Sequence, residues 1–393
     1  MSDAVQDAAP KGLLAKVARD WTRIGITGFG GPPAHIALLR QLVVRRNRWM
    51  GAREFEDANA ACGLLPGPAS TQLAIFCAYR VAGPAGAIVG GLGFIAPAVF
   101  LILALSILFL AHSPPMWVRG AGAGAGAAVA AVAVHAARGL IGPSLARARS
   151  DRLRAARWIA YLTIGTAAAA LLGQYLVLAL LGSGVIELIV QRQPRHTSAG
   201  QHASIGLLLP ASIAIGGIGA LAWTALKVGA LSFGGGFVII PLMQGGAVHT
   251  YHWMTNAQFL NAVALGQVTP GPVVATVAAV GYAAHGIGAG LLAALIAFTP
   301  SFSFVLVGAR HFEQLSENNN ARAFLDGAGP AAIGAILGAA IILTAALQAS
   351  WQFAILAAAA IALLALKRGV VETLVSAGAL GVIAALAGAA LPS

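Results

Sequence analysis

Short breaks made of glycine and proline recur in this chain, and breaks of this kind can create an anion-binding backbone. Phe29-Gly30-Gly31-Pro32 and Pro66-Gly67-Pro68 interrupt apolar sequence, and Phe233-Gly234-Gly235-Gly236 and Pro270-Gly271-Pro272 do so again. A broken helix exposes the N–H groups and the partial positive charge of its N-terminus, which favour anions. Glycine lets the backbone approach a ligand, and proline in the first helical turn gives up no needed N–H. We expect an anion site at the paired breaks, with close helix packing through small residues as the alternative.

Polar side chains follow each Pro-Gly-Pro element. Ser70, Thr71 and Gln72 come soon after the first element, and Thr276 comes soon after the second. Hydroxyl and amide groups in the first turn after a break can hydrogen-bond the oxygens of an oxyanion. The alternative is that these groups cap their own helices. The sequence leaves both interpretations open.

A cation precedes each Phe-Gly-Gly break. Arg23 stands six residues before Phe29, and Lys227 stands six residues before Phe233. A charged side chain inside a bilayer is costly and indicates a functional site by default. Two such cations would bracket a doubly charged anion. The alternative is snorkelling of both side chains to an interface, and Arg23 could instead pair with Asp20.

The two sets of breaks are related by a constant offset of 204 residues. At this offset Trp49-Met50 matches Trp253-Met254, and Phe94 matches Phe298. Matches that concentrate on Gly, Pro, Trp and Phe indicate a fused duplication, which is typical of secondary transporters. We expect an N-terminal half (1–195), a linking transmembrane segment (196–223) and a C-terminal half (224–393).

Several ionisable residues occur in the first copy only. They are His35, Glu54, Asp57 and Arg80, and their second-copy counterparts are Ile239, Gln258, Asn261 and Ala284. This asymmetry could carry proton coupling. Because Glu54 and Asp57 sit beside an arginine-rich loop, solvated ion pairs are the interpretation we favour for them.

The charges of equivalent loops predict the orientation of the two copies. The loop from Arg40 to Arg53 carries five arginines, whereas its partner from Gln244 to Ala257 carries no Lys or Arg. The positive-inside rule places the first loop in the cytoplasm and the second outside, so we expect the copies to be inverted. The basic loop Arg138–Arg157 then also falls inside.

The resulting fold class is an all-α polytopic membrane protein with an inverted-topology repeat. We expect nine full transmembrane helices plus four broken or re-entrant helical segments, the latter at 13–44, 55–79, 224–250 and 256–284. The expected full spans are about 84–111, 116–137, 158–172, 174–190, 205–222, 288–307, 328–347, 351–366 and 371–391.

The composition agrees with a membrane protein and excludes a soluble one. Of 393 residues, 59% are hydrophobic and only 9% are charged, whereas a typical soluble domain has about 25% charged residues. Apolar stretches near the ~20 residues needed to span a bilayer recur along the chain. The net charge of +12 comes mainly from arginines in short loops, which argues against nucleic-acid binding. The first ten residues are polar and acidic, and we expect no cleavable signal peptide.

The sequence offers no enzyme-like constellation. It contains no nucleophile elbow and no Walker loop, and Cys62 and Cys77 give neither a disulfide framework nor a metal spacing. We expect a protein that is not an enzyme and that has no cofactor and no bound metal.

Several of the stretches described above resemble the chromate ion transporter family in its long, two-half form. They are FGGPPAHIAL, LLPGPASTQLAIFCAYR and FGGGFVIIPLM with QVTPGPV, and the resemblance is clearest over residues 20–310. It implies an inner-membrane carrier built from two homologous halves of opposite orientation, which exports chromate and has sulfate as a structural analogue of its substrate. The motif positions that it carries over are Phe29–Pro32, His35, Pro66–Pro68, Ser70–Gln72, Arg80, Phe233–Gly236, Pro241 and Pro270–Pro272. Ala69 stands where many members of the family carry Asn, which removes one polar ligand candidate.

The leading hypothesis is a secondary transporter that exports chromate across the bacterial cytoplasmic (inner) membrane by alternating access and so confers chromate resistance. Sulfate or another oxyanion is the alternative substrate, and a membrane-embedded oxyanion-processing enzyme is the alternative class. The expected partners are the oxyanion and the lipid bilayer, and a homodimer is left open. The predicted substrate-binding residues are Arg23, Phe29, Gly30, Gly31, His35, Gly67, Ser70, Thr71, Gln72, Lys227, Phe233, Gly234, Gly235, Gly236, Gly271 and Thr276, with Glu54, Asp57 and Arg80 as candidates for coupling.

Overall fold

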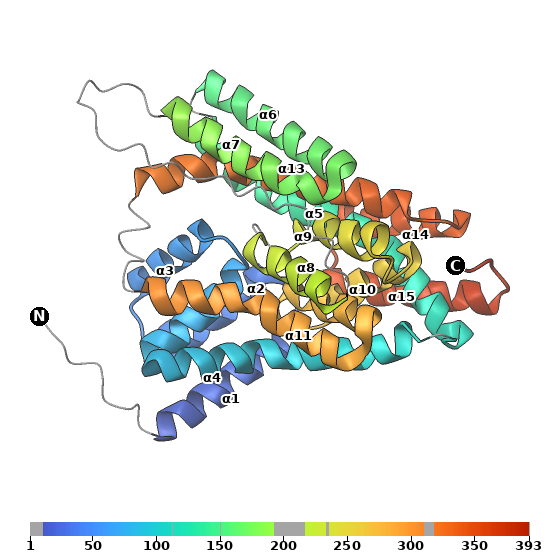
Figure 1. The fold of residues 1–393 in the computed structure, drawn as a ribbon, viewed down its shortest axis with the longest axis horizontal. Coiled ribbons are helices and arrows are strands. Elements are labelled where there is room, and N and C mark those ends of the chain that lie inside the picture. The colour runs from blue at the N-terminus through green and yellow to red at the C-terminus, as the bar shows by residue number, and fades with distance from the viewer. Residues whose placement is uncertain are drawn as a thin grey trace, which may run out of the picture.

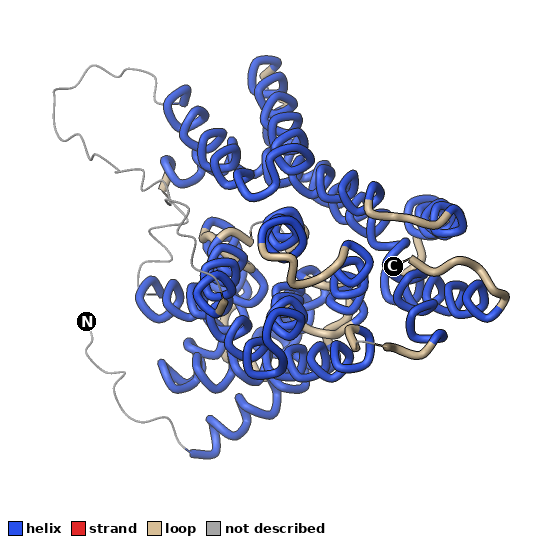
Figure 2. The backbone as a smooth tube through the Cα atoms, turned by 45° about the vertical axis from the view of Figure 1, so that its right-hand side comes forward, coloured by secondary structure: helices blue, strands red, loops and turns tan. Residues whose placement is uncertain are grey.

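The computed structural model of the chain describes residues 11–111, 113–149, 151–191, 217–232, 236–309 and 318–392, and every regular element in these ranges is helical (Figure 1, Figure 2). Five helices are long and apolar enough to cross a bilayer, namely Ala69–Phe109, Met116–Ala146, Arg152–Leu172, Val273–Gly308 and Asn319–Ala345. Shorter apolar helices are Leu176–Gln191, Ile218–Ala230, Ser350–Ala365 and Val370–Leu386. The chain is a multi-pass membrane protein, as its composition predicts.

The helices of the first half follow one another with short breaks. They are α1 (Lys11–Thr27), α2 (Pro32–Arg40), the π-helical turn η1 (Gln41–Arg46), α3 (Ala52–Leu64), α4 (Ala69–Phe109), α5 (Met116–Ala148), α6 (Arg152–Ala167), the short turns η2 (Ala168–Leu172) and η3 (Gly173–Tyr175), and α7 (Leu176–Gln191).

The second half has a closely similar series. It contains α8 (Ile218–Ala230), α9 (Ile239–Gln244), the π-helical turn η5 (Gly245–Thr250), α10 (Asn256–Val268), the 3-10 turn η6 (Val273–Thr276), α11 (Val277–Gly308), α13 (Asn319–Ala345), α14 (Ser350–Ala360), the π-helical turn η8 (Ile361–Ala365) and α15 (Val370–Leu386).

The backbone repeats the sequence offset in its irregular parts as well as in its helices. The π-helical turns η1 and η5 are 204 residues apart, as are the starts and ends of α3 and α10. Arg48 and His252, also 204 apart, share a positive φ of 51°, which is uncommon for residues other than glycine. Because such local strain is conserved between the copies, the sequence duplication is also a structural one.

Each half contains one kink within a long helix. In α4 the backbone is non-helical at Ala82 and Gly83, and in α11 it is non-helical at His285 and Gly286. The two kinks lie one residue off the offset of the sequence repeat. The expected full spans 84–111 and 288–307 begin just after these kinks, so each is joined to the preceding broken segment in one bent helix.

Helix α5 is longer than the sequence predicts. The sequence suggested a span of 116–137 and then a basic loop to Arg157, but α5 continues to Ala148 and α6 begins at Arg152. The reason is that this stretch is rich in Ala, Leu and Arg, which are strong helix formers. Asp151 then caps α6, since its side chain accepts a hydrogen bond of 2.9 Å from the Leu153 nitrogen.

The hairpin expected at 158–190 is present as α6, η2, η3 and α7. The expected span 205–222 lies largely outside the described residues, and only its end falls in the first turns of α8. The division at 195 and 223 stays a prediction.

The two halves exchange their terminal hairpins. Helices α6 and α7 of the first half pack against α13, whereas α14 and α15 of the second half pack against α5. Figure 1 shows α6, α7 and α13 together along the upper side of the molecule. Glycines allow this close approach, because a Cβ on Gly124 would meet the Ala377 carbonyl and one on Gly334 would meet the Leu162 carbonyl.

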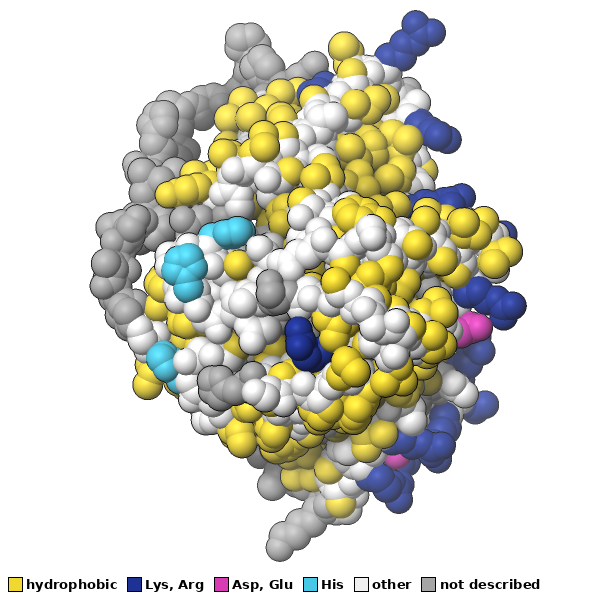
Figure 3. Space-filling model, turned by 90° about the vertical axis from the view of Figure 1, so that its right-hand side faces the viewer, with side chains coloured by type: hydrophobic (Ala, Val, Ile, Leu, Met, Phe, Trp, Pro, Cys, Tyr) yellow, Lys and Arg dark blue, Asp and Glu magenta, His cyan; other side chains and the backbone are white. Residues whose placement is uncertain are grey.

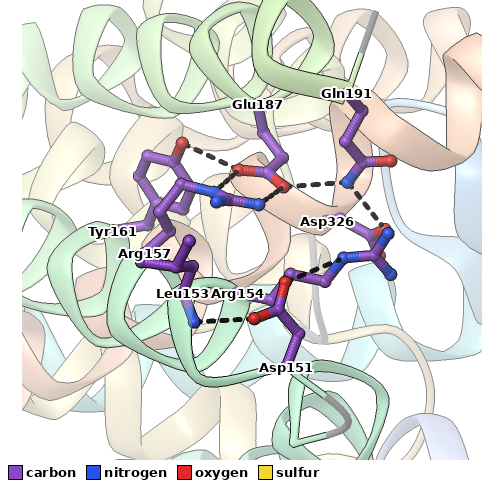
Figure 4. A network of polar contacts seen from close by, with 8 residues as sticks. All are labelled: Asp151, Leu153, Arg154, Arg157, Tyr161, Glu187, Gln191 and Asp326. Atoms are coloured by element: carbon purple, nitrogen blue, oxygen red, sulfur yellow. Dashed lines mark hydrogen bonds and ion pairs between the residues drawn. The ribbon is translucent and has the colours of Figure 1, made fainter. Parts of the chain in front are cut away.

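Polar contacts reinforce the α6–α7–α13 contact (Figure 4). The Arg157 guanidinium donates two hydrogen bonds to the Glu187 carboxylate, at 2.8 and 3.0 Å, and the Tyr161 hydroxyl donates a third at 3.0 Å. The Gln191 amide donates to Glu187 at 2.8 Å and to Asp326 of α13 at 3.3 Å. The hairpin of one half is thereby tied to the long helix of the other.

A second group of helices positions the breaks. Helix α1 packs on α4, α8 packs on α11, and α4 and α11 pack on each other. The contacts repeat between the copies, because Gly25 lies against the carbonyls of Gly93 and Phe94, and Gly229 lies against the carbonyl of Ala297. Figure 3 shows that Lys and Arg side chains gather along one edge of the face in view, while histidines lie on its other side.

Candidate functional site

A cavity of about 460 Å³ lies where the breaks of the two halves meet. Its wall is formed by the first-copy breaks, the second-copy breaks with the end of α10, helix α5 and the start of α15. The lining residues include Gly30, Gly31, Pro32, His35, Pro68, Ala69, Ser70, His135, Gly236, Gly266, Gln267, Thr269, Gly271, Pro272, Val273 and Val274. The breaks of the two halves, which the constant sequence offset relates, therefore line the same cavity.

The Phe-Gly-Gly break of the first half begins α2. Gly30 and Gly31 have φ angles of 101° and 72°, a region that glycine alone adopts readily. Pro32 and Pro33 then occupy the first two positions of α2. Because proline has no N–H, this helix end offers fewer backbone donors than the sequence pattern suggests.

The Pro-Gly-Pro breaks are the stronger source of backbone donors. Gly67 and Gly271 have φ angles of 115° and 101°, and each break is followed by a helical turn that starts at Ala69 or at Val273. The first N–H groups of a helix have no partner within it. Since Ala69 and Val273 both line the cavity, two equivalent helix starts, one from each half, face the same space.

His35 is the central polar side chain of the first wall. It is fully buried, its Nε2 lies 2.9 Å from the Gly28 carbonyl oxygen, and its Nδ1 lies 3.3 Å from the Ser70 hydroxyl. A carbonyl oxygen can only accept, so Nε2 carries a hydrogen, and Nδ1 of the neutral ring accepts from Ser70. The ring also meets Phe94 edge-on, with centroids 5.0 Å apart.

The second copy lacks this arrangement, because Ile239 and Val274 replace His35 and Ser70. The His35–Ser70 pair therefore makes the first-half wall polar at a place where the second half is apolar, and the second-half wall has Gln267 and Thr269 as its polar side chains instead.

Some predicted ligands point away from the cavity. The Gln72 amide donates 2.7 Å to the Pro66 carbonyl, and the Thr276 hydroxyl donates 2.7 Å to the Val273 carbonyl. Thr71 is fully buried and does not line the cavity. For Gln72 and Thr276 the capping alternative describes the contacts, since both side chains hold the backbone beside a Pro-Gly-Pro break. Gly67 likewise packs on Gln72 and Gly229 and is absent from the cavity wall.

The two candidate cations also lie outside the cavity wall. Arg23 is exposed on α1, and Asp20 pairs with Arg19 at 3.6 Å instead. Lys227 is half-buried on α8, with its ammonium nitrogen 5.7 Å from the centre of the Trp223 ring. Phe29 is 48% exposed. Of the second Phe-Gly-Gly break only Gly236 is placed at the cavity, because Phe233, Gly234 and Gly235 lie outside the described residues.

The candidates for coupling form ion pairs near the surface. Glu54 pairs with Arg80, and Asp57 lies 3.9 Å from Arg53. These contacts agree with the interpretation of Glu54 and Asp57 as solvated ion pairs. Neither these two carboxylates nor their arginine partners line the cavity.

Besides Thr269, two polar lining residues are absent from the site residues that the sequence predicts. His135 of α5 and Gln267 of α10 both line the cavity, and the Gln267 amide nitrogen is buried without a hydrogen-bond partner among the described residues. The signal for His135 is present in the sequence, because an ionisable residue within the apolar span 116–137 indicates a functional site.

The chemistry of the wall suits an oxyanion. The His135 and Gln267 side chains and the helix N-termini can donate hydrogen bonds, and no carboxylate is among the described residues that line the cavity. Such donors replace the water that an anion loses when it enters an apolar surrounding.

Comparison with known proteins agrees with this chemistry. The family described as "Chromate transporter" matches residues 15–188 and 219–389. The chain is 32% identical over 380 residues to the chromate transport protein of Cupriavidus metallidurans, covering 94% of this chain and 92% of that protein. It is 29% identical over 354 residues to the probable chromate transport protein of Synechococcus elongatus, covering 87% of each. No solved structure matches the chain. Because the family match covers both halves and their breaks, the chain belongs to the chromate transporter family.

Proposed function

We propose that this chain is a secondary transporter that carries chromate out of the bacterial cytoplasm through the cavity between the two sets of breaks. The observation that carries the proposal is that cavity, whose wall takes equivalent helix starts from both halves. Transporter substrates commonly bind near the bilayer midplane at a repeat interface, where discontinuous helices meet. The family membership and the named relatives support chromate as the substrate.

The proposed topology is inverted, with nine full spans and four broken ones. It is supported by the repeated backbone and by the arginine-rich loop that only the first copy carries. The exchange of hairpins between α5 and α13 gives each half a long helix that it shares with the other. Rocking of one half against the other would expose the cavity to alternate sides.

The proposed binding mode uses donors from both halves. Chromate accepts hydrogen bonds from the N–H groups at Ala69 and Val273, from His135, and from the Gln267 amide, which has no partner among the described residues. His35 and Ser70 bond to Gly28 and to each other, and they hold the first-half wall in place. Arg23 and Lys227 act from outside the wall, as cations that attract the dianion toward the breaks.

The membrane potential supports efflux as the direction. One charge that crosses the membrane gains about 2.3 kcal/mol per 100 mV. A dianion that leaves a negative-inside cell therefore gains roughly 4–5 kcal/mol at 100 mV. Export needs no coupled ion on this account.

The test is chromate flux in proteoliposomes with an imposed potential and with sulfate as a competitor. We expect flux that follows the potential and falls at least tenfold in Ser70→Ala, which removes the hydrogen-bond partner of His35. Ser106→Ala is the matched control, since Ser106 is a fully buried serine of the same helix that does not line the cavity. Absence of chromate flux from the unmodified protein would contradict the proposal that the chain transports chromate. Equal flux in Ser70→Ala and Ser106→Ala would show that chromate does not pass through this cavity.

A further inference from the structure

A second cavity, of about 440 Å³, lies where α4 ends and α5 begins. Its wall includes Ser113, Arg119 of α5, Gln258 and Asn261 of α10, and Gln352 of α14. It shares no lining residue with the central cavity. Figure 1 shows the connection from α4 to α5 at the right of the molecule near the C-terminus, the end that faces the viewer in Figure 3.

Arg119 is the charged residue of this wall. The wall contains no carboxylate among the described residues, and no ion pair of Arg119 occurs within the described part of the chain. A guanidinium without a carboxylate partner is free to bind an oxyanion with two parallel hydrogen bonds. The charge of the wall therefore favours an anion over a cation or a neutral ligand.

The repeat places two amides on the α10 side of this wall. Gln258 and Asn261 occupy the positions of Glu54 and Asp57, which pair with arginines in the first half. The second half has amides at both places. No carboxylate from α10 can then compete with an anion for Arg119.

The two amides have different surroundings. The Gln258 oxygen accepts a hydrogen bond of 2.9 Å from the Thr255 nitrogen, so this side chain caps α10. Asn261 lies against Gly122, which is one helical turn after Arg119 on α5. Arg119 and Asn261 thus belong to neighbouring turns of two helices in contact, and both face the same cavity.

We propose that the cavity bounded by Arg119 and Asn261 is a second oxyanion site, a vestibule through which chromate passes between the central cavity and the solvent on that side. Arg119 supplies the charge, and Asn261 and Ser113 supply neutral donors. The identity of the ligand rests on the proposed function. In the proposed topology this vestibule opens to the outside.

The test uses chromate exchange in right-side-out and inside-out membrane vesicles. Arg119→Gln removes the charge, and Asn261→Asp restores the carboxylate of the first half and neutralises Arg119. We expect each variant to raise the half-saturating chromate concentration about tenfold in one vesicle orientation and to leave the other unchanged. The double variant should be no worse than either single one. Arg53→Gln is the control, because Arg53 is a highly exposed arginine whose partner is Asp57.

Equilibrium dialysis of chromate against the detergent-solubilised protein separates the vestibule from the transport hypothesis. We expect two bound ions per chain for the unmodified protein and one for either variant. If the unmodified protein moves no chromate but loses one bound ion in Arg119→Gln, the proposed function fails, whereas the second oxyanion site at Arg119 and Asn261 stands. Unchanged exchange and unchanged binding in Asn261→Asp, a variant that keeps Arg119, overturn the vestibule even if Arg119→Gln does not fold.

Discussion

The backbone nitrogen of Gly271 donates a hydrogen bond of 3.2 Å to the carbonyl oxygen of Gly28. This bond joins the Pro-Gly-Pro break of the second half to the residue just before the Phe-Gly-Gly break of the first. The same carbonyl accepts from His35 at 2.9 Å. The Gly28 carbonyl oxygen therefore links His35, in the first-half wall of the cavity, to the Pro-Gly-Pro break of the second half.

Gly271→Ala should weaken this junction. Gly271 has a φ of 101°, and an added Cβ would press on the Ala98 side chain. A residue held in such backbone geometry costs about 1–3 kcal/mol, so we expect a lower melting temperature and reduced chromate flux. Gly63→Ala is the control, because a Cβ there meets nothing within 4 Å and Gly63 lies in the last turn of α3, where we expect no loss of stability. The measurement is thermal denaturation in detergent. Equal melting temperatures of the two variants would show that the Gly271–Gly28 junction does not stabilise the protein.

His35→Gln should lower chromate flux at least tenfold while the protein stays folded. The imidazole joins Gly28 to Ser70 through two ring nitrogens, and a glutamine side chain cannot span both contacts with the same rigid geometry. His249→Gln is the matched control, because His249 is exposed in η5. The measurement is flux in proteoliposomes at equal protein density. Flux in His35→Gln that equals the control would show that the bridge from Gly28 through His35 to Ser70 does not support the substrate site.

The breaks and the duplication could be predicted because they depend on local rules. Glycine and proline at Gly30–Pro32 and Pro66–Pro68 restrict the backbone whatever surrounds them, and a constant offset transfers each restriction to the second half. Gly67 and Gly271 have positive φ angles, which glycine permits and which the second half repeats.

The composition of the cavity wall could not be predicted in the same way. His135 reaches it only because α5 packs beside the breaks, and that packing depends on helices distant in the sequence. Arg23 and Lys227 stand at equal distances from their breaks, but spacing along a chain does not determine which face of α1 or α8 meets a cavity. Gln72 and Thr276 turn toward their own backbone, a choice of rotamer that residue type leaves open.

Arg157→Met should destabilise the protein. The Glu187 side chain is 5% exposed, whereas that of Arg157 is 27% exposed, so the variant leaves a buried carboxylate with only Tyr161 and Gln191 as donors. Removing one partner of a buried pair costs about 3–5 kcal/mol, and the partial exposure of Arg157 places the expected loss near the lower end.

A double variant controls for the lost charge. Arg157→Met with Glu187→Leu removes both partners, and we expect it to be more stable than Arg157→Met alone because no buried charge remains. Thermal denaturation of both proteins in detergent is the measurement. A double variant that melts below the single one would show that the hairpin is held by this network rather than by the packing of α6 and α7 on α13.

Gly124→Val should separate the exchanged hairpin of the second half from α5. Gly124 lies where α5 crosses α15, and a Cβ there would meet the Ala377 carbonyl and the backbone of Gly381. Adding bulk to a packed contact costs about 1–3 kcal/mol, and in a membrane the loss is not offset by a hydrophobic driving force between helices. Gly182→Val on α7 is the control, since a Cβ at Gly182 meets nothing within 4 Å. Size-exclusion chromatography after heating should show loss of the folded peak at a lower temperature for Gly124→Val only. If both variants melt together, the close approach of α5 and α15 does not stabilise the joined halves.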